Sequence, residues 1–152
     1  MLKFDEALRA VKGDFKIKVF KAGKLVDEFA DHNLIVNSGR VRLAELASGK
    51  SSAFIAKLGV GTGRVEEAED DEELENQVLL PLVNSEVDGR DARFGFVIKP
   101  EECCGMRITE FALFCADDVM FSHRVRRSSD GEVRGIEKED DIQIEGYWVV
   151  HF

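Results

Sequence analysis

The stretch from Met106 to Val125 is the densest apolar run in the sequence, and it limits most strongly what the chain can fold into. Apolar residues at 108 and 111–114 precede the break Ala116-Asp117-Asp118, and apolar residues at 119–121 and 125 follow it. Two β-rich runs separated by a short polar break predict a hairpin. Beyond Glu110 both faces of the first strand are apolar, which indicates a central strand covered on both sides. We therefore expect the rest of the chain to pack around this hairpin.

Length and composition predict one globular domain. The chain has 152 residues, of which 44% are hydrophobic and 34% charged. That length suits a single domain, residues 1–152, whose core is large enough to be stable without disulfide bonds or bound metal. No apolar run approaches the roughly 20 residues that span a bilayer, and the N-terminal sequence lacks the apolar region of a signal peptide. We expect a protein that is cytoplasmic on synthesis and has no membrane partner.

Charge and cysteine content narrow the possible partners. The net charge of −9 would repel a phosphate backbone, so we expect no nucleic-acid partner. Cys103 and Cys104 are adjacent and lack CxxC spacing; zinc held by them with His123 is conceivable, but no second ligand pair is spaced for it. Free thiols, with Cys115 in the core, are the preferred interpretation. The role of Cys103 and Cys104 stays open, and we expect no cofactor.

Alternating apolar and polar residues predict a mainly β fold, a β-sandwich of antiparallel strands. Further strands are expected over 14–21, 24–30, 33–36, 54–60, 77–83, 92–99 and 141–152. Pro81 removes a hydrogen-bond donor, which indicates that 77–83 is an edge strand or an extended linker. Gly146 is expected to mark a bulge or bend in the last strand.

One short helix is predicted near residues 38–48. Asn37 or Ser38 would cap its start and Gly49 would follow its end. Its apolar face would comprise Val41, Leu43, Ala44, Leu46 and Ala47. An N-terminal helix is also expected, because Phe4, Leu8 and Val11 have helical spacing and Gly13 would end it. Residues 1–13 equally suit a loose arm that docks on a neighbouring subunit.

A glycine-rich segment and an acidic segment follow the strand at 54–60. Gly59, Gly61 and Gly63 suggest a phosphate loop, but GK[ST] is missing and acids follow directly, so a strand end or bulge is favoured. Residues 65–76 are mostly acidic without the DxDxDG spacing of a calcium loop. We expect a solvated, mobile loop or a short exposed helix there; whether it binds a cation stays open.

Glu110 lies beside Phe111 in the apolar strand, where an isolated carboxylate would be costly to bury. It needs a backbone or arginine partner, which Arg107 or Arg124 would supply across the hairpin, or it lies on the solvent-exposed edge. A structural ion pair is therefore favoured over a catalytic acid.

The remaining titratable residues form no catalytic constellation. His32, His123 and His151 are in separate strands, and the first two are expected at the surface. Arg124, Arg126 and Arg127 form the only basic cluster. It would face solvent and balance the charge of the abundant acidic residues, or bind a phosphate or an acidic partner.

Four segments together resemble bacteriophage and prophage tail proteins of the tail-fibre or tail-collar type. The segments are HNLIVNSGRVRLAEL (32–46), AKLGVGTGRVE (56–66), GMRITEFALFCADDVMFSHR (105–124) and IEKEDDIQIEGYWVVHF (136–152). Such proteins have a small helix after an Asn-rich strand, a GxGxG strand end, an EFGLF-like strand and a closing W-x-V-x-F-like strand. This chain has Ala112 in place of the glycine and Phe121-Ser-His-Arg124 in place of LFAR.

The resemblance implies a structural component that joins a fibre or baseplate and self-associates, with no catalytic residues. Its partners would be other tail or baseplate proteins and further copies of the chain. Phe4, Leu8 and Phe20 are the predicted assembly surface. Two alternatives are a carbohydrate-type ligand-binding β-sandwich, which the core-like position of Trp148 disfavours, and a small enzyme with a deep polar pocket.

Overall fold

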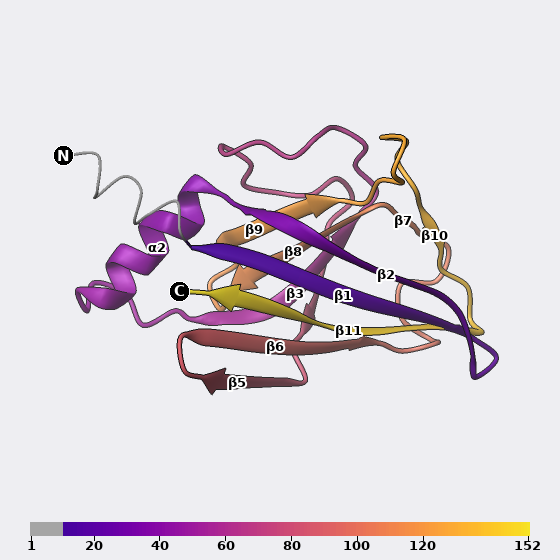
Figure 1. The fold of residues 1–152 in the computed structure, drawn as a ribbon, viewed down its shortest axis with the longest axis horizontal. Helices are drawn as coiled ribbons and strands as arrows, with labels where there is room; N and C mark the ends of the chain where they lie inside the picture. Colours follow the sequence, from indigo (N-terminus) through magenta and orange to yellow (C-terminus); the bar gives the residue numbers. More distant parts are fainter. Residues whose placement is uncertain (1–10) are drawn as a thin grey trace.

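A computed structural model describes residues 11–152 (Figure 1), and these residues confirm the mainly β fold with one short helix. The sheet strands are β1 (Lys12–Lys21), β2 (Lys24–Ile35), β3 (Ile55–Gly61), β4 (Val78–Pro81), β5 (Asn84–Asp88), β6 (Asp91–Ile98), β8 (Glu110–Cys115), β9 (Met120–Val125) and β11 (Ile142–His151). Two short strands, β7 (Arg107–Ile108) and β10 (Ile136–Glu137), pair with each other, and helix α2 spans Asn37–Ala47. Within the described part of the chain, no helix is long and apolar enough to cross a membrane.

The nine longer strands form one continuous antiparallel sheet rather than two separate ones. Their order is β4-β3-β8-β9-β2-β1-β11-β6-β5. The two halves of the sheet meet where the end of β2 pairs with β9, through Leu34 and Ile35. The sheet curls so that these halves face each other (Figure 1), and the ring of Phe15 in β1 lies 6.0 Å from that of Phe111 in β8. The main core lies between the halves.

The predicted central hairpin is confirmed as β8 and β9, and every residue of β8 is buried. Phe111 and Leu113 point into the main core. Ala112 and Phe114, on the opposite face, pack in a smaller cluster with Val36, Leu74 and Met120. The unbroken apolar run thus reflects two separate apolar layers, one on each face of the strand.

Alternating burial along the outer strands also agrees with the predictions. Phe15, Ile17 and Val19 are buried in β1, as are Phe94, Phe96 and Ile98 in β6 and Ile142, Ile144, Trp148 and Val150 in β11. The turn at Ala22-Gly23 has positive φ at both residues, which suits a tight hairpin. β4, which ends at Pro81, is an edge strand as expected.

Helix α2 is where predicted, but its contacts differ. Neither predicted cap acts as one, because Val36 precedes the helix and the Ser38 hydroxyl donates to the carbonyl of Met120 (2.6 Å). Gly39 and Arg42 form the buried face, whereas Val41 is 59% exposed. A Cβ at Gly39 would lie 2.2 Å from the carbonyl oxygen of Phe121. The helix therefore packs on β9 by close backbone approach, without an apolar stripe.

Two local expectations were wrong, and one strand was not predicted. β1 already begins at Lys12, so no helix ends at Gly13; residues 1–10 lie outside the described part of the chain. Gly146 pairs in regular register with Ile17 and Phe96, without a bulge. A Cβ there would lie 2.0 Å from the Lys16 carbonyl oxygen, so close strand packing requires the glycine. Strand β5 was not expected, because all five of its residues are exposed and show no apolar alternation.

Candidate functional site

Glu110 lies at the start of β8 and is 3% exposed. One carboxylate oxygen faces Nε2 of His123 at 2.7 Å. The other accepts the backbone N–H groups of Gly63 (2.6 Å) and Glu75 (3.0 Å). Both oxygens are thereby satisfied, which a buried charge requires.

The predicted ion pair of Glu110 with Arg107 or Arg124 is wrong. Glu110 is opposite Val125 in the register of the hairpin. His123, two residues from Val125, shares that face of β9, whereas Arg124 points to the other face. Arg124 instead pairs with Asp31 and Glu67, each at 2.8 Å, and Arg107 pairs with Glu137 near the surface.

His123 is buried, and both ring nitrogens face carboxylates. Nδ1 lies 2.8 Å from Asp71, and Nε2 faces Glu110. An ionised carboxylate only accepts, so a protonated imidazole that donates from both nitrogens satisfies this arrangement. Burial by itself lowers the pKa of His123, but the hydrogen bonds to Glu110 and Asp71 outweigh it and raise that pKa above its ordinary value. The expectation that His123 lies at the surface was wrong.

The acidic segment 65–76 forms a loop, but it is not solvated throughout. Glu67 has a side chain only 8% exposed and accepts the backbone N–H of Val125 (3.0 Å). Asp71 bonds His123, and Leu74 is buried in the smaller apolar cluster. Three side chains therefore tie the loop to the central hairpin, while most of the other acids remain exposed.

The glycine-rich segment makes room for Glu110. A Cβ at Gly61 would lie 2.6 Å from a Glu110 carboxylate oxygen, and one at Gly63 would lie 2.3 Å from it. The Thr109 hydroxyl donates to the Gly63 carbonyl at 2.5 Å and holds the segment in place. The glycine-rich strand end predicted over a phosphate loop is what the structure contains.

The hydrogen bonds of Glu110 and His123 hold separate segments of the chain together. Glu110 and His123 expose at most 5% of their side chains. The charges join β8, β9 and the acidic loop, and we call Glu110, His123 and Asp71 the latch.

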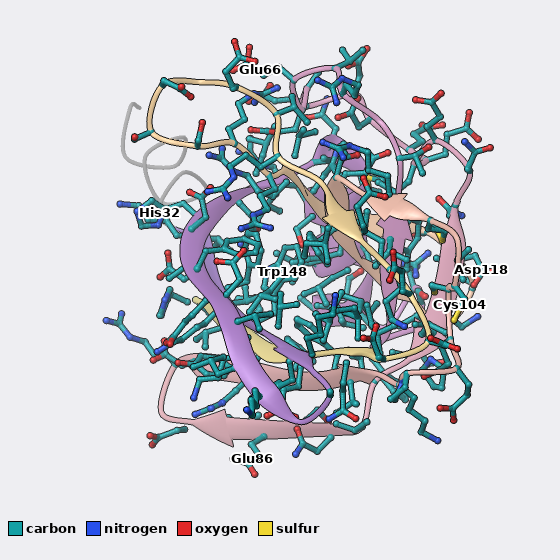
Figure 2. All side chains as sticks on the ribbon, turned by 90° about the vertical axis from the view of Figure 1, so that its right-hand side faces the viewer. His32, Glu66, Glu86, Cys104, Asp118 and Trp148 are labelled. Atoms are coloured by element: carbon teal, nitrogen blue, oxygen red, sulfur yellow. The ribbon has the colours of Figure 1, made fainter. Side chains whose placement is uncertain are left out.

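A second row of histidines and acids crosses the outer face of the sheet. His151 faces Asp91 at 2.8 Å and Asp14 at 2.7 Å, and Asp14 also bonds His32. Hydrogen bonds to Asp91 and Asp14 raise the pKa of His151. These side chains are substantially exposed, and Figure 2 shows His32 at the periphery. Within residues 11–152, no group of three or more His, Cys, Asp or Glu is arranged to hold a metal ion.

The basic cluster, Arg124, Arg126 and Arg127, pairs with acidic residues of the chain, as predicted, but it is partly buried rather than fully exposed to solvent. Arg126 is 4% exposed, pairs with Asp27 at 2.6 Å and lies over the Phe29 ring at 4.0 Å. Arg127 lies 3.8 Å from Glu67. These contacts commit the guanidinium groups to the chain's own acids.

All three cysteines are free thiols in the structure. Cys115 is fully buried, as predicted, and burial raises its thiol pKa. Cys104 is exposed, and Figure 2 shows it at the periphery of the view.

Residues of α2, the β5–β6 hairpin and the C-terminus line an apolar groove. Figure 1 shows these elements at the same end of the molecule. We call the groove the end groove; its volume is about 260 Å³. Its lining includes Leu43, Leu46, Phe54, Val87, Phe94 and Phe152. Phe54 is 64% exposed, Val87 81% and Phe152 44%. No sequence pattern indicates this surface, because its residues come from five separated segments.

Of the predicted assembly surface, Phe4, Leu8 and Phe20, the structure describes only Phe20. Phe4 and Leu8 lie outside the described residues. Phe20 is half-buried and lines a different groove with Ala22, Gly23 and Pro100.

Trp148 is fully buried in the middle of the molecule (Figure 2), where it stacks on Phe15 at 4.8 Å. It is therefore closed to a sugar ring. Tyr147 lies on the outer face with the Arg93 guanidinium 3.7 Å from its ring centre. Both line an open groove of about 510 Å³ that also contains Asn84 and Glu145.

No family model, curated protein or solved structure matches the chain.

Proposed function

We propose that this protein is a structural, non-catalytic component of a phage tail or a phage-derived tail-like particle, associated with the fibre or baseplate. One support is the position of the segments that carry the resemblance. Residues 32–46 form the end of β2 with most of α2, 56–66 include most of β3, and 105–124 contain the central hairpin. Strands β3, β8, β9 and β2 are consecutive in the sheet, so three of the four segments form one contiguous unit, whereas β11 of the fourth is separated from β2 by β1.

The observation that carries the proposal is the end groove beside an open strand edge. β5 is an edge strand of the sheet formed by residues 11–152. Exposed edges recruit further strands, and exposed apolar patches mark interaction sites. Here Val87 belongs to both the edge and the groove. A surface of this kind suits a chain that joins other chains.

The opposite edge differs. β4 contains Pro81, which lacks a backbone N–H and so blocks strand addition there. The two edges thereby direct assembly toward β5, where the apolar residues are also exposed.

Antibody labelling tests the proposal. Tailed particles are purified from the strain that encodes the chain and labelled with gold-conjugated antibody against it. We expect gold at the tail or its distal end in most particles. Recovery of the chain only in the particle-free fraction would contradict the proposal.

A carbohydrate-type ligand module is the second candidate, favoured by the groove of about 510 Å³ beside Tyr147. Its aromatic ring, amide and carboxylate groups are those that sugars contact. A glycan array with wild-type protein and Tyr147→Ala tests it. Hits that Tyr147→Ala abolishes would favour this candidate, and an array without hits would remove it.

A further inference from the structure

We infer that the end groove binds the N-terminal segment of a second copy of this chain, residues 1–10, through Phe4 and Leu8. This inference rests on the proposed function and names the partner of its docking surface.

The groove fits an apolar helical stripe. Its exposed lining is supplied by Phe54, Val87 and Phe152, with Leu43 and Leu46 on the wall formed by α2. An amphipathic helix docks in such a groove through side chains one turn apart. Phe4 and Leu8 have the i, i+4 spacing that places two side chains on one helix face.

The N-terminal segment leaves the sheet at the edge of this groove. Lys12 pairs with His151 in the β1–β11 register, so Val11 is next to Phe152, which lines the groove. A helix rises 1.5 Å per residue, so ten residues reach about 15 Å. A segment that starts here reaches the groove of a copy placed directly against this end of the molecule.

The short connection favours a second copy over the chain's own groove. Leu8 precedes by only three residues Val11, which itself packs against the core beside the start of β1. A connection this short acts as a short hinge, and short hinges favour exchange between copies. Two copies related by a two-fold axis would each fill the other's groove, which closes the assembly as a dimer.

Mass in solution gives the first test. Light scattering of the full chain is expected to give twice the 17.0 kDa of one copy. The double variant Phe4→Asp/Leu8→Asp and the groove variant Phe54→Asp should both halve the mass while circular dichroism stays unchanged. Val65→Asp is the matched control, since Val65 is 84% exposed and does not line the groove. A wild-type monomer, or a dimer that both groove and segment variants retain, would overturn the inference.

Isotope mixing distinguishes exchange from self-docking. Phe4→p-benzoylphenylalanine is incorporated, and ¹⁴N and ¹⁵N chains are mixed, refolded together and irradiated. We expect cross-links from residue 4 to the Phe54 or Phe152 peptide, about half of them between unlike isotopes. Cross-links only within one isotope would overturn the inference in favour of self-docking. A dimer that meets every expectation but is missing from tail particles would contradict the proposed function and leave this inference standing, whereas a monomer found in particles would do the reverse.

Discussion

Replacing His123 with alanine should destabilise the protein far more than the same change at His151. Both histidines lie between two carboxylates at 2.7 and 2.8 Å. They differ in burial, because the His123 side chain is 5% exposed and that of His151 is 40% exposed. The pair of variants therefore separates the effect of burial from that of the contact itself.

The expected loss in the free energy of unfolding depends on which charged groups each variant leaves without a partner. His123→Ala leaves the Glu110 charge buried, and breaking a buried pair costs roughly 3–5 kcal/mol. Glu110 keeps its two backbone N–H donors, so we expect about 3 kcal/mol. His151→Ala breaks exposed pairs and should cost at most about 1 kcal/mol.

Urea unfolding at pH 7 measures both losses as free energies of unfolding. In a thermal scan, His123→Ala should lower Tm by about 6–12 °C, at roughly 2–4 °C per kcal/mol for a chain of this size. Glu110→Gln added to His123→Ala should recover about 1 kcal/mol, because an amide oxygen still accepts both N–H groups without a buried charge. Equal losses for the two histidines, or no recovery in the double variant, would refute the role of the buried charge.

Three further predictions concern pH, packing and thiol reactivity. The pKa of His123 is raised in the folded state, so the stability that its charge adds is complete below about pH 6.5 and is lost as the pH rises through the pKa of the folded state. The difference in the free energy of unfolding between wild type and His123→Ala should therefore narrow from pH 6 to pH 9. A constant difference would contradict a protonated His123 in the latch. Gly63→Ala should cost about 1–3 kcal/mol in urea unfolding, since its Cβ would overlap the Glu110 carboxylate; a neutral effect would show that the carboxylate can move. Ellman's reagent should label Cys104 in the native protein and Cys115 only in denaturant, and fast native labelling of Cys115 would contradict its burial.

The central part of the fold follows from local pattern. The apolar run in 106–125 had to be covered on both faces, and the turn at Asp117-Asp118 could only separate two strands. Period-2 alternation similarly placed β1, β6 and β11, because their inward faces are uniformly apolar. These strands are predictable since burial acts on each of them independently.

The latch and the end groove could not be predicted from local sequence pattern, because both depend on contacts between segments that are distant in the sequence. Glu110 needed a partner, but register decided that it was His123 rather than Arg124. The glycines at 61 and 63 carried a signal in retrospect, since side chains there would occupy the space of a buried carboxylate. Strand β5 carried no signal, because an edge strand with exposed residues needs no apolar alternation.

Titration of the purified chain into a tail-assembly extract tests most directly whether it acts as a part of the particle or as a catalyst. The extract comes from a strain that lacks the chain, and completed tails are counted by electron microscopy as the protein is added. A structural component predicts a linear rise in tail number, a plateau at a fixed number of copies per tail, and retention of the added protein in the particles. Full restoration by far fewer copies than tails, with the protein left outside the particles, would contradict the account.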